Sequence, residues 1–360
     1  MTAFLRTPYG LYRDGGNWVA PLESERRRFL SARHNPFLAR ARIGVFCAFR
    51  DGTPTGRIAA MTNPDAGPGE PDGYFGHFEC VNDPQAAGAL MDAAEAWLRS
   101  RGVHTVPGPM SPNTHHECGL LVEGVGETGT IGMPYTPLLR GVADRLGDET
   151  RDGPAVLAVG PPESATQRTG AAEACRRRRG ITVRDVGLPP AARDSWILRD
   201  LYHEAWRDNW GFTPMTENEL AHLAGLLTAV PVPPIVRLAQ VGGRPVGFSI
   251  LKQALAPARG RLTRWGLPIG AWRLHRALHR VDRGRLLAVG VPSRQRHPGI
   301  GAVLALDAAL IARARGWREV EVSWVLENNH AANRPLTSIG AAVFKRHRLC
   351  TRRLDHQGPA

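Results

Sequence analysis

Residues 289–302 read VGVPSRQRHPGIGA and decide the fold of this 360-residue chain. An apolar segment typical of a strand runs into a short basic turn, and the apolar spacing of a helix begins directly after it. Gly299 and Gly301 let a ligand approach the backbone closely, and the start of the helix presents N–H groups without helical acceptors. Such a junction binds phosphate or pyrophosphate, so the stretch predicts a phosphate-binding loop. An ordinary strand–helix turn is the alternative, and the neighbouring Arg294 and Arg296 favour the loop.

The pattern around this loop occurs twice in the chain. Residues 43–106 and residues 235–326 each contain a hairpin, a strand, a helix that ends in Arg-Gly and a further strand. Tight-turn residues at 50–53 and 241–244 predict the two hairpins. A strand–helix–strand segment forms a right-handed crossover between parallel strands, so each copy predicts a mixed sheet. The predicted fold class is therefore α/β with two similar domains.

The segment between the two copies has a different composition. Residues 146–167 are rich in glycine, proline and acidic residues without a clear period, which predicts an irregular connection. The run Arg176–Arg179 predicts the end of a linking helix, and residues 181–186 predict the strand that opens the second domain.

The composition bounds the class of protein. The chain carries 46 Lys plus Arg against 33 Asp plus Glu, a formal net charge of +13, and 42% of its residues are apolar, as in a globular protein with a real core. All basic residues except Lys252 and Lys345 are arginines, which suit phosphate-bearing partners; a basic surface without such a partner is the alternative. Five scattered cysteines without a C-x-x-C pair argue against a disulfide framework. With no secretory signal pattern and no apolar run of about 18 residues, we expect a cytoplasmic protein without a membrane span.

The loop and its surroundings resemble a known superfamily. Arg296-x-x-Gly299-x-Gly301 after a strand resembles the acyl-CoA pyrophosphate loop of the GCN5-related N-acetyltransferase (GNAT) superfamily. Residues 323–329 and 339–345 fit the later part of the same fold. In the first half, similarity extends over residues 75–79, 93–102, 108–110 and 117–119. Together these segments resemble bacterial tandem-GNAT proteins.

The resemblance implies an α/β fold of two tandem GNAT-like mixed-sheet domains, of which the first is degenerate. Residues 81–85, VNDPQ, stand where the first domain would have its phosphate loop. They lack both glycines, and Asp83 would repel pyrophosphate. We expect the degenerate domain over residues 1–145, a connector with the linking helix over 146–180, and the acyltransferase domain over 181–360.

The resemblance also implies the reaction and the donor. A small amine would attack the thioester of an acyl-CoA directly, with acetyl-CoA as the expected donor and no metal, and a backbone N–H near Val291 would polarise the carbonyl. The residues expected to bind the donor are Val291, Arg294, Arg296, Gly299, Ile300, Gly301, Ala302 and Asn329.

Candidates for proton transfer come from the strand at 319–327 and from the residues near 347. Strand alternation places Glu319, Glu321, Ser323, Val325 and Glu327 on one face, so Glu327 and Glu321 are candidate bases; a polar face that is solvated or covered by a helix is the alternative. Many GNAT enzymes have a tyrosine four residues before the glycine of the last helix as general acid. That position is Leu336 here, so His347 is the candidate acid, unless the leaving group needs none.

The acceptor side is expected at residues 204–214, EAWRDNWGFTP. By the resemblance, this segment between the first two helices of the second domain lines the acceptor site. Aromatic rings offer stacking surface and carboxylates can hold an ammonium, although core packing is the alternative for Trp206 and Phe212. The candidates are Glu204, Trp206, Asp208, Asn209, Trp210 and Phe212. The sequence HHEC at residues 115–118 is not expected to bind a metal, because side chains on consecutive residues cannot readily ligate one ion.

An arginine-dense segment favours a rival donor. Residues 256–285 contain eight arginines, one acidic residue and two tryptophans, and Arg273, Arg276 and Arg280 could form an RNA-binding arm. An amphipathic helix with a solvated basic face is the alternative. Because some tandem-GNAT enzymes take an aminoacyl group from aminoacyl-tRNA, such a transferase is the second hypothesis. A catalytically inactive tandem GNAT that binds a ligand or a protein is the third.

Overall fold

The computed structural model divides the chain into two compact units, which are described one at a time. The first consists of Met1–Thr128, Gly132–Pro154 and Lys345–Ala360, and the second of Gly129–Ile131 and Ala155–Phe344. The structure describes residues 1–360 except 14–17, 19, 68–69, 113–115, 128–148, 160–169, 189–191, 210–211, 229–231, 255–280, 296–298 and 355–360.

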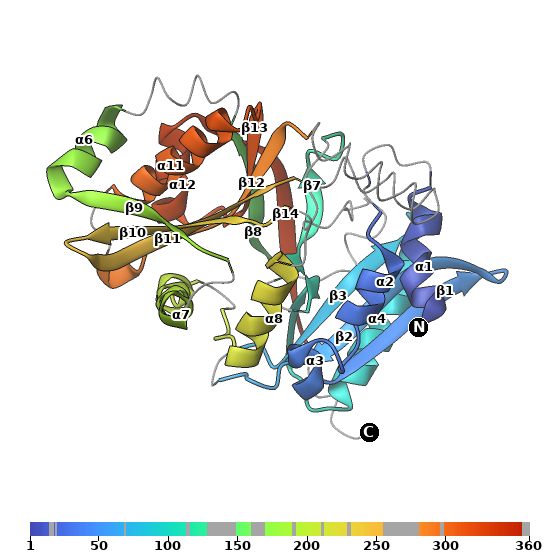
Figure 1. The fold of residues 1–360 in the computed structure, drawn as a ribbon. Coiled ribbons are helices and arrows are strands. Elements are labelled where there is room, and N and C mark those ends of the chain that lie inside the picture. Colours follow the sequence, from blue (N-terminus) through green and yellow to red (C-terminus); the bar gives the residue numbers. More distant parts are fainter. Residues whose placement is uncertain are drawn as a thin grey trace. The chain divides into compact units, whose positions relative to one another are not determined.

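The first unit contains a three-stranded antiparallel sheet with helices on both faces (Figure 1). Successive residues of the middle strand point to opposite sides, so Ile58 and Ala60 pack toward one helix while Ala59 and Met61 pack toward another. The strands are β1 (Ile43–Arg50), β2 (Thr53–Thr62) and β3 (Gly73–Cys80). Helix α4 (Pro84–Arg99) covers the first face, and α1 (Thr2–Leu11) covers the second, near α2 (Glu23–Phe29) and α3 (Pro36–Arg40).

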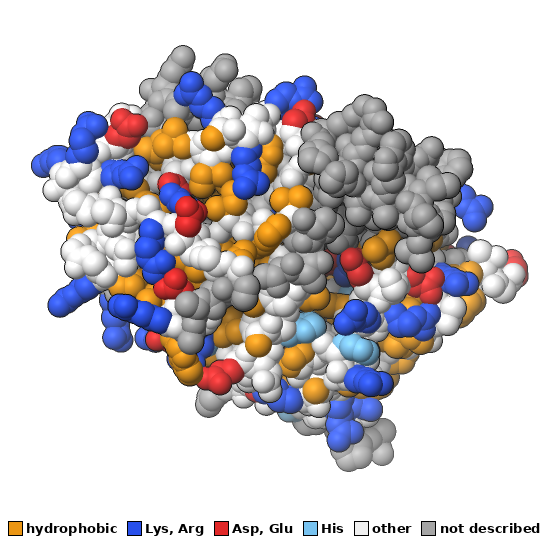
Figure 2. All heavy atoms as spheres, in the orientation of Figure 1, with side chains coloured by type: hydrophobic (Ala, Val, Ile, Leu, Met, Phe, Trp, Pro, Cys, Tyr) orange, Lys and Arg blue, Asp and Glu red, His pale blue; other side chains and the backbone are white. Residues whose placement is uncertain are grey.

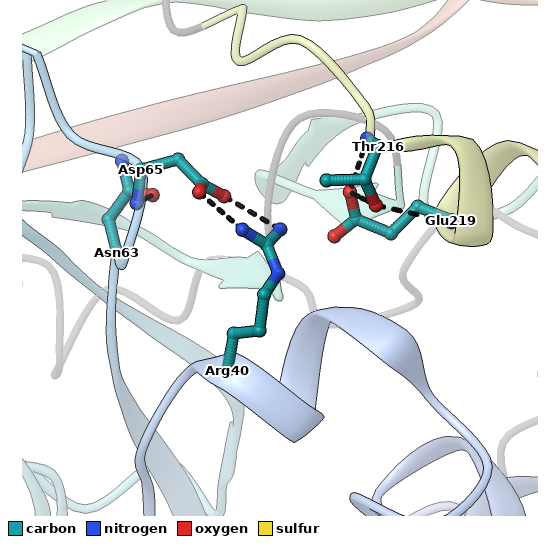
Figure 3. A network of polar contacts seen from close by, with 5 residues as sticks. All are labelled: Arg40, Asn63, Asp65, Thr216 and Glu219. Atoms are coloured by element: carbon teal, nitrogen blue, oxygen red, sulfur yellow. Dashed lines mark hydrogen bonds and ion pairs between the residues drawn. The ribbon is translucent and has the colours of Figure 1, made fainter.

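Short strands complete the first unit. β4 (Thr105–Gly108) and β7 (Leu120–Glu123) each pair antiparallel with the residues of β14 (Ala341–Arg353) that belong to this unit, and β5 (Met110–Ser111) pairs with β6 (Glu117–Cys118). At the end of α3, Arg40 forms a two-pronged ion pair with Asp65, and Asn63 accepts a hydrogen bond from the Asp65 N–H (Figure 3). The part of β14 from Lys345 onward thus belongs to the N-terminal unit.

The second unit contains a sheet with the order β9, β10, β11, β12 and β13. Neighbouring strands are antiparallel except β12 and β13, which are parallel and joined through α11. The sheet strands are β9 (Ile181–Val186), β10 (Ile235–Val241), β11 (Arg244–Gln253), β12 (Arg283–Gly290) and β13 (Glu319–Leu326). The helices are α6 (Gly170–Arg179), α7 (Ala192–Trp206), α8 (Glu217–Thr228), α11 (Ile300–Ala314), α12 (His330–Ser338) and the 3-10 turn η2 (Ser293–Gln295).

Helices cover both faces of this second sheet. On β10, Ala239 faces the cluster that contains the first turn of α11, whereas Leu238 faces the cluster that contains α7. Helix α8 begins with a capping box, in which the Glu219 carboxylate accepts from the Thr216 N–H at 2.7 Å and the Thr216 hydroxyl oxygen accepts from the Glu219 N–H at 3.3 Å (Figure 3).

The turn and helix-end predictions are confirmed. Asp51 and Gly52 have φ of 49° and 76°, and Gly242 and Gly243 have φ of 55° and 77°, the positive values that a two-residue hairpin turn requires. Helix α11 ends in a Schellman motif, because Gly316 has φ of 69° and the Trp317 N–H donates to the Ala312 carbonyl at 2.9 Å.

The irregular connection predicted for residues 146–167 is wrong in part. Residues Glu149–Val159 form strand β8, which has residues in both units. The first half of this strand, ETRDGP, has poor strand propensity and no alternation. Only its end, AVLAV, is apolar, and Leu157 there packs in the core of the second unit.

A buried histidine is part of the first unit's core. His77 on β3 has φ of 47° and contacts the rings of Phe4 and Phe29 edge-on at 6.0 and 6.2 Å. Its ring nitrogen Nε2 is buried without a hydrogen-bond partner among the described residues. Burial lowers the pKa of His77 well below its usual value, and the nearby charges of Arg57, Arg26 and His116 lower that pKa further.

We therefore expect the first unit to lose stability in mild acid. The unfolded chain binds a proton at this histidine below about pH 6.5, whereas the folded chain, with the lower pKa, does not. Stability is then lost as the pH falls below the unfolded value, by up to about 1.4 kcal/mol per pH unit. His77→Asn, which tolerates positive φ, should reduce the drop in the thermal unfolding midpoint between pH 7.5 and pH 5.5. The exposed His34→Asn serves as the control, and an unchanged drop in the His77 variant would contradict the assignment.

Candidate donor-binding site

The predicted phosphate loop is a turn between β12 and α11. Strand β12 ends at Gly290, η2 follows, and Gly299 is the N-terminal cap of α11 with φ of 105°. The Val303 N–H donates to the Gly299 carbonyl at 2.9 Å, so the N–H groups of Ile300, Gly301 and Ala302 belong to the first turn, before that bond. Three consecutive N–H groups at a helix start can bind an anion.

Position 299 requires a glycine for two reasons, its backbone conformation and the close approach of Cys175. Its left-handed φ disfavours residues with a Cβ, and a Cβ there would lie 2.3 Å from the Cys175 Sγ on α6. Gly301 differs, because a Cβ there would meet only Pro335 atoms at 3.5 and 3.8 Å, an ordinary contact.

Strands β12 and β13 part next to this loop. Their parallel register runs only from Arg283 opposite Glu319 to Leu286 opposite Val322, although the two fully described strands continue to Gly290 and Leu326. β12 also has a bulge, since Ile250 pairs with Ala288 and Leu251 with Leu286, which leaves Leu287 as an extra residue. Bulges redirect a strand and are frequent next to functional sites.

A pocket of about 510 Å³ lies where the two strands part, and it belongs to the second unit. Its walls are mainly apolar side chains of β12, β13 and α12, and its polar side chains include those of Asn209, Asn329 and Arg334. Gly299, Gly301 and Ala302 line the same pocket, so the turn at the start of α11 and the apolar space are continuous. The arrangement suits a ligand with a phosphate group at one end and an apolar acyl arm at the other.

Buried polar contacts fix the walls of the pocket. The Arg285 Nε donates to the Ser323 Oγ at 2.6 Å, and the Ser323 hydroxyl donates to the Glu321 Oε1 at 2.8 Å. Arg285 and Glu321 lie 3.8 Å apart and are both buried. The Asn333 Nδ2 donates at 3.0 Å to the carbonyls of Leu326 and Glu327, which ties α12 to the end of β13.

Comparison with known proteins places the chain in a family. The scan against protein-family models found no match. The chain is 32% identical over 362 residues to protein YghO of Escherichia coli K12, covering 97% of this chain and 92% of that protein. It belongs to the YghO family. This YghO-family chain is also 29% identical over 366 residues to a bacterial ceramide synthase of Caulobacter vibrioides, covering 96% of this chain and 93% of that protein.

Solved structures show the fold of this YghO-family chain. A tandem GNAT protein from the clavulanic acid biosynthesis pathway matches 100% of this chain and 95% of its own with a TM-score of 0.57 at 13% identity. A GCN5-related N-acetyltransferase from Sphaerobacter thermophilus matches 99% and 94% of the two chains with a TM-score of 0.53 at 16% identity. The fold is therefore a tandem GNAT fold, as the sequence resemblance predicted.

Several residues predicted for the site line the pocket, and others do not. Of the donor candidates, Ile300 is buried in the core beside the loop, and Arg294 is exposed on the loop. Among the acceptor and base candidates, Glu204, Asp208, Phe212 and Glu327 do not line it. The predicted residues that do line it are Val291, Gly299, Gly301, Ala302, Asn329, Trp206 and Asn209.

Three of these residues meet at one side of the pocket. Trp206 at the end of α7 stacks on Tyr202 at 4.7 Å between ring centroids and lies 5.9 Å from Phe248, so it is both a core and a pocket residue. The Asn329 Nδ2 donates to the Asn209 Oδ1 at 3.5 Å, and the Asn329 Oδ1 caps α12 by accepting from the Ala332 N–H at 3.2 Å.

The remaining predicted residues lie elsewhere. Glu321 is held in the buried contacts with Ser323 and Arg285. His347 is a fully buried residue of β14 in the first unit, opposite Leu121. Arg296, Trp210, Arg273, Arg276 and Arg280 lie outside the described residues, as does His115.

The corresponding place in the first unit is filled by its own chain. β3 has a bulge like that of β12, because Arg57 pairs with Glu79 but Ala59 pairs with Gly76. A Cβ on Gly76 would lie 1.7 Å from the Met110 carbonyl oxygen of β5. The His77 N–H at this bulge donates to the Ser111 Oγ at 2.9 Å. The first domain is thus degenerate through packing as well as through its loop sequence.

The helix start of the first unit is also satisfied internally. Asp83 caps α4, and its carboxylate accepts from the Gln85 N–H at 2.9 Å and pairs with Arg50. The N–H groups of Gln85 and Ala86, together with Arg50, lower the pKa of Asp83, so its carboxylate stays ionised at the start of α4.

The described residues contain no group of three or more His, Cys, Asp or Glu side chains that could hold a metal ion. Over the same part of the chain, no helix has the length and apolar character needed to cross a membrane.

Gly299→Ala should destabilise the second unit, because it strains a left-handed residue and forces Cys175 away. The expected cost is about 1–3 kcal/mol, seen as a lower thermal unfolding midpoint. Gly301→Ala, two residues away in the same helix, is the matched control and should leave the midpoint unchanged or slightly raised. Adding Cys175→Gly to Gly299→Ala should recover only the steric part of the loss. Equal midpoints for the two alanine variants would show that Gly299 is not constrained.

Proposed function

We propose that this chain is an N-acyltransferase that transfers an acyl group from an acyl-CoA to the amine of a long-chain amino alcohol. One observation supports the proposal: the glycine turn at Gly299 opens directly into the apolar pocket between β12 and β13. The relative named as a bacterial ceramide synthase supports the acceptor class, since a ceramide is the N-acyl derivative of such an amino alcohol. The small amine expected from the sequence is then the head of a long apolar molecule.

In this reaction the amine nitrogen attacks the thioester carbonyl carbon. The ammonium first loses one proton to give the free amine. As the new C–N bond forms and the C–S bond breaks, the nitrogen loses a second proton and the departing thiolate gains one, so one proton is released overall. The pyrophosphate would bind the N–H groups that start α11, and the thioester would lie between the parting strands, where a backbone N–H near Val291 can polarise its carbonyl. Asn209 and Asn329 supply polar atoms in an otherwise mainly apolar wall and would orient the amine.

The base remains a prediction. Glu327 at the end of β13 is half-buried, and it would accept the proton through a water molecule, because its side chain does not line the pocket. Glu327→Gln should lower kcat by about 10²-fold or more without a comparable change in KM. The exposed Glu217→Gln on α8 is the comparison variant and should keep the wild-type kcat. A normal kcat in the Glu327 variant would remove Glu327 from the mechanism.

The reaction is tested by incubating the purified chain with acetyl-, octanoyl- and palmitoyl-CoA and with either sphinganine or a small amine. Release of free thiol and the mass of the amide product report turnover. Sphinganine should be acylated, and Ala302→Trp, which fills the pocket, should lower kcat/KM more than tenfold. Ala314→Trp at the exposed far end of α11 should not. No turnover of any acyl-CoA would refute the proposal, and turnover of aminoacyl-tRNA alone would establish the rival donor.

A further inference from the structure

Helix α6 borders the phosphate loop although it lies outside the repeated hairpin–strand–helix–strand unit. Cys175 packs in the apolar cluster that contains Ile300 and Val303 of α11. Its Sγ occupies the space next to Gly299 into which a side chain at that position would project. Ala172, one turn earlier, is also buried. The position of α6 relative to the loop glycine is therefore set by direct packing within the second unit.

The last turn of α6 consists of four exposed arginines, Arg176–Arg179. Among the described residues, one acidic side chain is within ion-pair distance of them, the exposed Glu173 at 3.9 Å from Arg177. Like charges three positions apart, as at Arg176 and Arg179, destabilise a helix, and one or two cations would suffice to complement the helix dipole. Basic side chains gather around the place of α6 in Figure 2. This concentration of charge is not explained by the stability of the helix.

Helix geometry places two of the four arginines on the side of α6 that contacts the loop. Arg178 and Arg179 are three and four residues beyond Cys175, so they lie on the same side of α6 as the residue that contacts Gly299. Their backbone is about 5 Å farther along the helix axis. Because Cys175 contacts the cap of α11, these two arginines project from the face of α6 that lies against the start of α11.

We infer that the last turn of α6 is a subsite for the 3′-phosphate of the donor's nucleotide. The inference rests on the proposed function, because it concerns the nucleotide end of an acyl-CoA bound at the same loop. Coenzyme A carries a phosphate monoester on the ribose besides its pyrophosphate, with a charge between −1.5 and −2 at about pH 7. The planar guanidinium of arginine matches two phosphate oxygens at once. The loop binds the pyrophosphate, and α6 selects nucleotides that also carry the 3′-phosphate.

The test compares coenzyme A with 3′-dephospho-coenzyme A, two ligands that differ by this single group. Dissociation constants are measured by calorimetry for the wild-type chain and for Arg178→Gln/Arg179→Gln. The wild type should prefer coenzyme A by about tenfold, the equivalent of about 1.4 kcal/mol, and the double variant should bind the two ligands equally. Its affinity for 3′-dephospho-coenzyme A should stay at the wild-type value.

A matched control removes the same charge elsewhere in the second unit. Arg244→Gln/Arg313→Gln replaces two exposed arginines, one in the β10–β11 hairpin and one in the last turn of α11, and should keep the tenfold preference.

A preference for coenzyme A that survives in the α6 variant overturns the subsite alone. Equal weakening of both ligands overturns it too, because the effect would then not depend on the 3′-phosphate. If the wild type binds neither ligand, the proposed donor fails with it. Loss of tRNA binding in the α6 variant, with unchanged coenzyme A binding, would assign the arginines to RNA.

Discussion

The early end of pairing between β12 and β13 is the constraint on which the second unit depends. Parallel neighbours normally share hydrogen bonds along their whole length, yet here the ladder stops at Leu286 and Val322 while both strands continue. Backbone groups beyond that point need other partners. On β13 the Asn333 amide supplies them for the carbonyls of Leu326 and Glu327, which also fixes α12 as a wall of the pocket. The space between the strands is therefore built by the fold and does not depend on a loop.

The first unit shows that the same fold can close this space. Its β3 keeps the bulge, but the neighbouring chain lies too close to β3 for two glycines to carry a Cβ. A Cβ on Gly76 would lie 1.7 Å from the Met110 carbonyl oxygen of β5, and a Cβ on Gly108 of β4 would lie 2.4 Å from the Phe75 carbonyl oxygen of β3. In the second unit Gly299 also makes room for the protein's own chain, because a Cβ there would lie 2.3 Å from the Cys175 Sγ. The space where β12 and β13 part nevertheless stays open as a pocket of about 510 Å³. The duplicated pattern thus produces one open site and one that is packed shut.

Local chemistry predicted much of the fold from the sequence. Positive φ at Asp51 and Gly242 follows from turn residues, and the end of α11 follows from Gly316. Features that depend on distant residues were not predictable. Alternation placed Glu321 on a polar face, but only the folded chain brings Arg285 within 3.8 Å of it and makes that face buried. Strand β8 was missed because its pairing partners, and not its own sequence, make it a strand.

The starts of α4 and α11 differ in how the protein balances their positive charge. Both α4 and α11 expose N–H groups at the positive end of a helix dipole. At α4 the Asp83 carboxylate already accepts from the Gln85 N–H and is paired with Arg50, so the local charge is balanced. At α11 the cap is Gly299, which has no side chain to accept from these groups, and the adjoining helix α6 ends in four arginines. The positive end of α4 is therefore balanced by the protein's own carboxylate, whereas the cap and first turn of α11 carry no acidic side chain. The basic excess behind the net charge of +13 is thus balanced at one junction and left unbalanced at the other.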